Sequence, residues 1–229
     1  MSTEIPPARP DPDAAAKVQI LATEHWSLLA TRSLTYTESL SRVTIFLSIV
    51  SGVVVALALV AQVSRLGPAF IAIAIPLLSV VAFTGTSTMG RLMTLNRDDF
   101  RWVVGMNRLR RAYLELHPEL ERYLVTGSHD DMPGVLQTLG IDVSSAHRAG
   151  SVLHALQTLP GMLSVIVGSV FAAIAALAGL AFGAPSIGVI VVSVLVFVLA
   201  MAWLTIWGRR ELRRRDPSLE PHFSAPGHE

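Results

Sequence analysis

The chain has 229 residues, of which 52% are hydrophobic, and its formal net charge is only +1. A charge so close to zero gives no electrostatic case for binding nucleic acid, and the absence of cysteine excludes disulfides, thiolate metal sites and cysteine nucleophiles. Four apolar runs, 43–63, 68–89, 160–182 and 187–207, contain no Asp, Glu, Lys, Arg or His. Because a charge at mid-bilayer costs about 2.5–3.5 kcal/mol, uncharged runs of this length predict four membrane spans. The remaining residues are too few for a large enzyme core.

The N-terminal part of the chain predicts a short tail followed by a long helix. Residues 1–12 contain four prolines and predict a disordered tail. Residues 13–42 predict a helix, since positions 22, 26, 29, 33, 36, 40, 43 and 47 form a row with the alternating spacing of four and three that is typical of a helical seam. Apart from Pro12, neither Gly nor Pro occurs between Asp11 and Gly52, so we expect one helix to continue from this segment into the first span.

The first two spans, 43–63 and 68–89, carry few polar groups. In the first span Ser48, Gly52 and Ala56 are spaced by four, and small residues at this spacing let helices approach closely in lipid. In the second span the hydroxyl side chains gather at one end: Thr84, Thr86, Ser87 and Thr88. They either bond to their own helix backbone, the interpretation we favour, or line a wet pathway.

Residues 90–159 predict a helical domain outside the membrane. A second row with spacing of three and four runs from Leu92 to Leu116, and His117-Pro118 should end that helix. A short helix is expected over 118–124, and another over 132–139, capped by Asp131 and closed by Gly140. A last helix, starting near residue 142 or 144, is expected to continue toward the third span, unless Pro160-Gly161 kinks it.

The cluster His129-Asp130-Asp131 is the one group that resembles a chemical site. His and carboxylate side chains can ligate zinc or a hard cation, but three adjacent residues rarely point at one ion, so turn and capping roles are favoured. The chain has no Gly-rich phosphate loop, GxSxG or HExxH motif. We therefore expect no catalytic activity, no cofactor and no bound metal.

The second pair of spans, 160–182 and 187–207, has another row of small residues: Ser164, Gly168, Ala172 and Ala176. This row predicts close helix packing, either within one subunit, which we favour, or between subunits. The C-terminal segment 208–229 begins with Arg209, Arg210, Arg213, Arg214 and Arg215, and the residues after them are predicted to form a disordered tail. These arginines predict contact with lipid headgroups, as a topology anchor or as a specific anionic-lipid site.

The distribution of basic residues predicts the orientation. Seventeen of the eighteen Lys and Arg residues fall in the N-terminal segment, in 90–159 or in the C-terminal segment, and only Arg65 lies on the other side. By the positive-inside rule, both termini and the middle domain are cytoplasmic. The expected fold is therefore all-α, with transmembrane hairpins at 43–89 and 160–207 and a cytoplasmic helical domain formed by helix extensions.

Two stretches carry a resemblance to known proteins: EHWSLLATRS at 24–33, and 98–136, which contains DDFRWVVGMNRLRRAYLELHPEL. With the paired spans they resemble an uncharacterised family of bacterial four-span membrane proteins. The resemblance implies a multi-pass protein of the inner membrane and adds no site residue. We expect a non-enzymatic structural or interaction module that contacts lipids, forms a homo-oligomer and binds a cytoplasmic protein partner. The alternative is an oligomeric ion channel or pore, lined by the first or second span.

Overall fold

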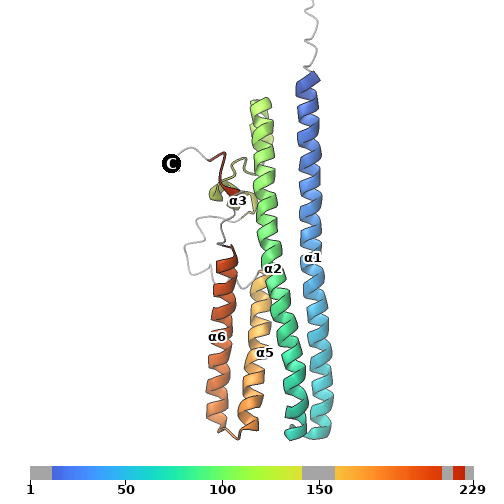
Figure 1. Ribbon diagram of the computed structural model, residues 1–229, viewed down its shortest axis with the longest axis vertical. Helices are drawn as coiled ribbons and strands as arrows, with labels where there is room; N and C mark the ends of the chain where they lie inside the picture. The colour runs from blue at the N-terminus through green and yellow to red at the C-terminus, as the bar shows by residue number, and fades with distance from the viewer. Residues whose placement is uncertain (1–11, 141–157, 213–218, 225–229) are drawn as a thin grey trace, which may run out of the picture. The chain divides into compact units, whose positions relative to one another are not determined.

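The computed structural model describes residues 12–140, 158–212 and 219–224. All regular elements in these ranges are helical, as predicted, and Figure 1 shows their order. They are α1 (Pro12–Ser64), α2 (Pro68–Leu116), the 3-10 helix η1 (Pro118–Tyr123), α3 (Met132–Thr138), α5 (Leu159–Ala181) and α6 (Ser186–Leu212). Four of them, α1, α2, α5 and α6, are long and apolar enough to cross a membrane. Each contains one of the four predicted runs.

Helices α1 and α2 are much longer than a bilayer requires. They contain 53 and 49 residues, which at 1.5 Å per residue gives lengths of about 75–80 Å, against about 30 Å for a hydrocarbon core. The expected continuation of the N-terminal helix into the first span is confirmed, and α2 accommodates Pro76 in its interior. Helix α2 ends at Leu116, directly before His117-Pro118, as the proline predicted.

Short connections join the long helices. Between α1 and α2 lie residues 65–67, of which Arg65 and Leu66 have left-handed backbones with φ of 49° and 57°. Between α5 and α6 lie residues 182–185, where Gly183 takes φ of 73° without strain. Figure 1 shows α5 and α6 side by side, and their contact is borne out by Gly168, which faces Phe197.

The chain divides into two compact units, and both α1 and α2 contribute to each. The described residues of the first unit are 12–34, 99–140 and 219–224; those of the second are 35–98 and 158–212. The second unit has the larger core, to which all four long helices contribute: Phe46, Val81, Ala82, Met89, Leu92, Leu163, Val167 and Leu204. The first unit has a small core of Val103, Val104 and Val135, against which Phe100, Leu139 and Leu219 pack.

The start of α5 corrects one prediction. The helix does not continue through Pro160 from an upstream helix, because Thr158 has extended backbone angles and its hydroxyl accepts a hydrogen bond from the Gly161 N–H at 3.2 Å. Proline fits this position, since the first turn of a helix needs no backbone donor there. The predicted tail at 1–11 and the predicted helix before residue 158 fall outside the described residues.

Candidate functional site

One face of α1 packs within the chain. In the first unit its half-buried side chains recur every three or four residues: Val18, Leu21, His25, Leu28 and Arg32. The Arg32 guanidinium pairs with both oxygens of Asp99, at 2.7 and 3.4 Å, and the His25 ring stacks on Tyr113 with centroids 6.0 Å apart. This contact between α1 and α2 therefore combines aliphatic side chains, such as Leu28 against Gly105, with an ion pair and an aromatic stack.

The electrostatic environment of His25 favours its neutral form. Burial is the main cause that lowers the pKa of His25, and the positive charge of Arg110 lowers it further. The ring can then stack on Tyr113 without carrying a charge near neutral pH. Burial also raises the pKa of Tyr113, which keeps that side chain neutral as well.

The adjacent face of α1 is exposed although it is apolar. Trp26 is 71% exposed, Leu29 41%, Tyr36 63% and Leu40 40%. These residues belong to the row that the sequence predicted as a helical seam. Trp26 and Leu29 each follow a residue of the packed row, His25 and Leu28, by one position. Since one residue is about 100° of helix rotation, the predicted seam points away from the packed face. We call these four residues the α1 apolar face.

The small-residue rows differ in their surroundings. A Cβ at Gly168 would lie 3.4 Å from the Phe197 ring of α6, and one at Gly179 would lie 3.3 Å from Val189. The row in α5 thus contributes to packing within the chain. A Cβ at Gly52 of α1 would meet nothing within 4 Å, and neighbouring Ser48 is also exposed. Gly168 thus supports the interpretation that we favour for α5, which stays a prediction for the row as a whole, whereas in α1 Ser48 and Gly52 are exposed and Ala56 is half-buried.

Among the glycines of the second unit, Gly85 has the closest neighbours, and the sequence did not predict this contact. A Cβ there would lie 2.6 Å from Val167 Cγ2 and 2.9 Å from Phe46 Cε2. Both of those side chains are fully buried. Gly85 belongs to neither small-residue row, and its position between two threonines gave no signal of this contact.

The predicted hydroxyl band does not form one surface. Thr84 and Thr86 donate to the carbonyls of Val80 and Ala82, at 2.9 and 2.8 Å, as helix hydroxyls commonly do. Ser87 is exposed and Thr88 is buried. The bonds of the two threonines weaken the argument for a pore, which stays a prediction.

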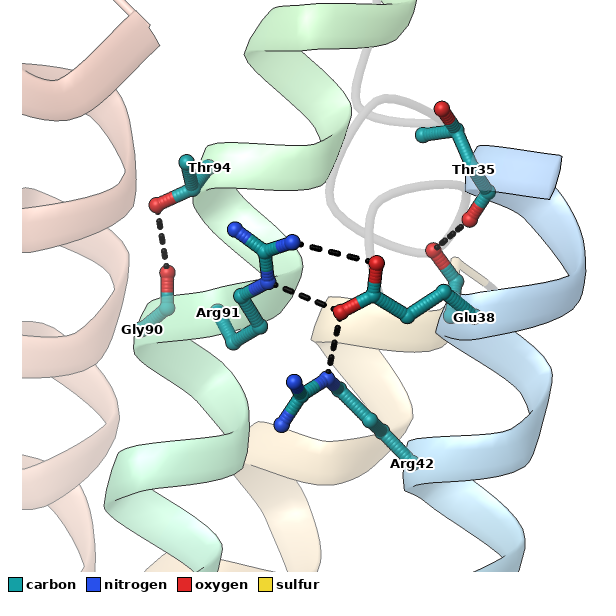
Figure 2. A network of polar contacts seen from close by, with 7 residues as sticks. Thr35, Glu38, Arg42, Gly90, Arg91 and Thr94 are labelled. Carbon is teal, nitrogen blue, oxygen red and sulfur yellow. Dashed lines mark hydrogen bonds and ion pairs between the residues drawn. The ribbon is translucent and has the colours of Figure 1, made fainter. Parts of the chain in front are cut away.

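A charged cluster links α1 to α2 just beyond the apolar run 43–63, in the second unit. Figure 2 shows Arg91 and Arg42 converging on Glu38. Arg91 donates to both Glu38 oxygens at 2.9 and 3.0 Å, and Arg42 donates to one at 2.8 Å. These bonds, the one from Arg91 above all, lower the pKa of Glu38 to about 2. From the sequence, only the spacing of four between Glu38 and Arg42 could have suggested part of it.

A polar centre organises the first unit. The fully buried Asn107 donates to the carbonyls of His129 and Gly134, at 2.7 and 3.2 Å, and its oxygen accepts a bond from Thr138 at 3.0 Å. Gly134 is required here, because a Cβ would collide with the His129 carbonyl. Asn107 thereby fixes the loop that carries the cluster His129-Asp130-Asp131.

The two carboxylates of that cluster have different roles. Asp131 caps α3, as predicted, by accepting a hydrogen bond from the Gly134 N–H at 3.0 Å. Asp130, for which the sequence predicted only a role in the turn, is buried and bonds to the C-terminal segment. Among the described residues, no three His, Asp or Glu side chains gather as a metal site would require.

The predicted lipid-headgroup arginines are described only in part. Arg209 and Arg210 lie exposed in the last turn of α6, where cations also interact favourably with the helix dipole. Arg213, Arg214 and Arg215 fall outside the described residues. Near the same helix end, Arg97 pairs with Glu211 at 3.4 Å.

Comparisons of the chain with family models, curated proteins and solved structures find no match. The resemblance to four-span bacterial proteins therefore stays a prediction. The four long apolar helices indicate a multi-pass membrane protein.

Proposed function

We propose that the chain is a non-enzymatic membrane protein whose α1 and α2 extensions form a cytoplasmic interaction module that joins copies into a homo-oligomer. The α1 apolar face carries this proposal. Its residues precede the apolar run 43–63, yet they expose Trp26, Leu29, Tyr36 and Leu40. Covering a fully exposed side chain of this size gains about 1.5–3 kcal/mol, so such a face favours a partner.

Lipid can cover only part of this face. Trp26 lies seventeen residues before Val43, which is about 25 Å along a helix axis at 1.5 Å per residue. The interfacial layer on each side of a bilayer is roughly 5–8 Å thick, so it can reach Leu40 and the edge of Tyr36. Trp26 and Leu29 lie beyond it on a helix that continues into the span. A protein surface is therefore the better cover for these two residues.

A second copy of the chain fits this face. All copies in one membrane share one orientation, so α1 helices of neighbouring copies run parallel. A row with spacing of four and three is then self-complementary across a two-fold axis, as in a parallel coiled coil. Within the span, Gly52 leaves room for a second helix to approach. A different cytoplasmic protein is the competing occupant.

The proposed topology places the two pairs of spans as hairpins in a bacterial inner membrane, with both termini cytoplasmic. Its support is the distribution of basic residues, together with the short connections at 65–67 and 182–185. Because the chain lacks cysteine, single cysteines report sidedness directly. Val125, 95% exposed, and Leu66, 65% exposed, are suitable positions. An impermeant thiol reagent should label Leu66→Cys in intact cells and Val125→Cys only after permeabilisation; the reverse pattern would invert the topology.

Disulfide scanning tests the homo-oligomer. Single cysteines at each position from 26 to 40, oxidised in the membrane, should give dimers with maxima at 26, 29, 33, 36 and 40. Leu34 is the matched control, because it is as exposed as Trp26, at 71%, but lies off the row. If the dimer yield did not follow the spacing of three and four, or if no position gave a dimer, the proposal that a second copy covers the α1 apolar face would be contradicted.

Substitution gives an independent measurement. The double variant Trp26→Ser, Leu29→Ser should lower the mass of the particle in detergent or nanodiscs, whereas Leu34→Ser should leave it unchanged. A wild-type chain that is strictly monomeric and captures no partner on crosslinking in cells would refute the proposed interaction module altogether.

A further inference from the structure

The C-terminal segment 219–224 lies against the first unit through an unusual set of bonds. Asp130, whose side chain is 0% exposed, accepts bonds from two successive backbone N–H groups, those of His222 at 2.9 Å and Phe223 at 2.8 Å. The Asp130 N–H donates in return to the Phe223 carbonyl at 3.3 Å. A buried carboxylate therefore binds the main chain of this segment rather than its side chains.

Arg108 of α2 completes the polar contacts. The Arg108 Nε donates to the Asp130 carboxylate at 2.8 Å, and the terminal nitrogen Nη2 donates to the Glu220 carbonyl at 2.8 Å. Burial of Asp130 by itself opposes ionisation, but the bonds from His222, Arg108 and Phe223 outweigh it and lower the pKa of this carboxyl. Asp130 is thus ionised at neutral pH, as an acceptor of several bonds should be.

An apolar contact lies beside these bonds. Leu219 packs against the core of Val103, Val104 and Val135. The segment thus offers one apolar anchor, followed by two N–H donors three and four residues later. This combination of main-chain bonds and an apolar side-chain anchor is how many domains bind extended peptides.

We propose that Asp130, Arg108 and the apolar core of Val103, Val104 and Val135 form a peptide-docking site, which the chain's own segment 219–224 occupies reversibly. Four of the six residues of this segment are exposed, and a segment with so little buried surface opens locally at a low cost in free energy. A tethered segment acts at an effective concentration in the millimolar range, so it excludes weaker peptides while it is docked. When it is released, the site is open to another peptide of the same kind. This site does not depend on the proposed homo-oligomer.

Binding of a free peptide in trans tests the proposal on the full chain. The probe is a labelled synthetic peptide with the sequence of residues 216–229. In the variant Phe223→Pro the tethered segment lacks one N–H donor, so the site should bind the probe at least about tenfold more tightly than the wild type does. Phe223→Ala removes the same ring but keeps the N–H, so its gain should be smaller. Adding Asp130→Ala to Phe223→Pro should abolish binding.

Hydrogen exchange gives a second measurement that does not need the probe. In the wild-type chain, the amides of His222 and Phe223 should exchange at least about tenfold more slowly than in Asp130→Ala. Glu115→Ala is the control, because its exposed carboxylate belongs to the same unit and pairs with Arg111 rather than with the segment. The proposal would be overturned if the wild type and Phe223→Pro bound the probe equally well, or if neither bound it. It would also be overturned if the His222 and Phe223 amides of the wild type exchanged as fast as those of a free peptide.

Discussion

Substituting Gly85 and Gly52 by alanine separates packing within the chain from an open helix surface. Both glycines lie inside long helices, so each substitution gains a similar helix propensity, at most about 1 kcal/mol. At Gly85 the added methyl would lie 2.6 Å from Val167 and 2.9 Å from the Phe46 ring, both fully buried. Overpacking of this kind costs about 1–3 kcal/mol, whereas Gly52 has nothing within 4 Å to obstruct the methyl.

The difference between the two variants is the quantity to measure, because the helix-propensity gain cancels. Thermal unfolding of the monomeric chain in one detergent should place the Tm of Gly85→Ala below that of Gly52→Ala by about 2–12 °C, from roughly 2–4 °C per kcal/mol for a chain of this size. In the monomer, where no second helix faces Gly52, Gly52→Ala should equal or exceed the wild type. If Gly85→Ala were as stable as Gly52→Ala, the close approach of α2 to Phe46 and Val167 would be wrong.

Three further predictions concern polar groups. Asn107→Ala removes the side-chain donor to the His129 carbonyl and one of the two side-chain donors to the Gly134 carbonyl, so we expect a loss of about 1–3 kcal/mol in total, measured by chemical unfolding, while a wild-type-like curve would refute the polar centre. The pKa of Glu38 is lowered to about 2 in the folded state, so the ionised carboxylate stabilises the fold fully above the ordinary pKa near 4.5. The difference in Tm between the wild type and Glu38→Gln should therefore close only as the pH falls from 4.5 toward 2, and a difference that closes above pH 5 would contradict the charged cluster. Burial lowers the pKa of His25 in the folded state, so the unfolded chain binds the imidazole proton more tightly than the folded chain does. The Tm of the wild type should therefore fall relative to that of His25→Phe as the pH drops below about 6.5, whereas a constant difference in Tm across this range would argue against the buried ring.

The boundaries of several elements could be predicted because local chemistry sets them. Helix α1 continues from Pro12 into its apolar run since no residue in its first 40 positions after the proline breaks a helix. Helix α2 ends before His117-Pro118, and α3 begins at the cap of Asp131 and is followed by Gly140 with φ of 70°. Each of these signals lies within a few residues of the boundary it sets, so a single sequence is sufficient to find it.

The packing partners could not be predicted because they depend on distant residues. Gly52 and Gly85 are both helical glycines with small neighbours, yet one is open and the other contacts two buried side chains. Asp131 is recognisable from the sequence as a helix cap, but the adjacent Asp130 bonds to a segment 92 positions later in the chain. Nothing local in the sequence predicts that distant partner or separates the two glycines.

The choice of the packed face of α1 shows how polar pairs can override an apolar pattern. The row that the sequence favours as a seam contains Trp26 and Leu29, but the row that packs contains His25 and Arg32. A buried or half-buried arginine needs a carboxylate, and Asp99 supplies it at 2.7 Å. Rotating α1 by one residue to bury Trp26 would remove that ion pair, so the polar pair selects the face that packs within the chain. The more apolar face then stays exposed, so its exposure is a consequence of specific pairing rather than of poor packing.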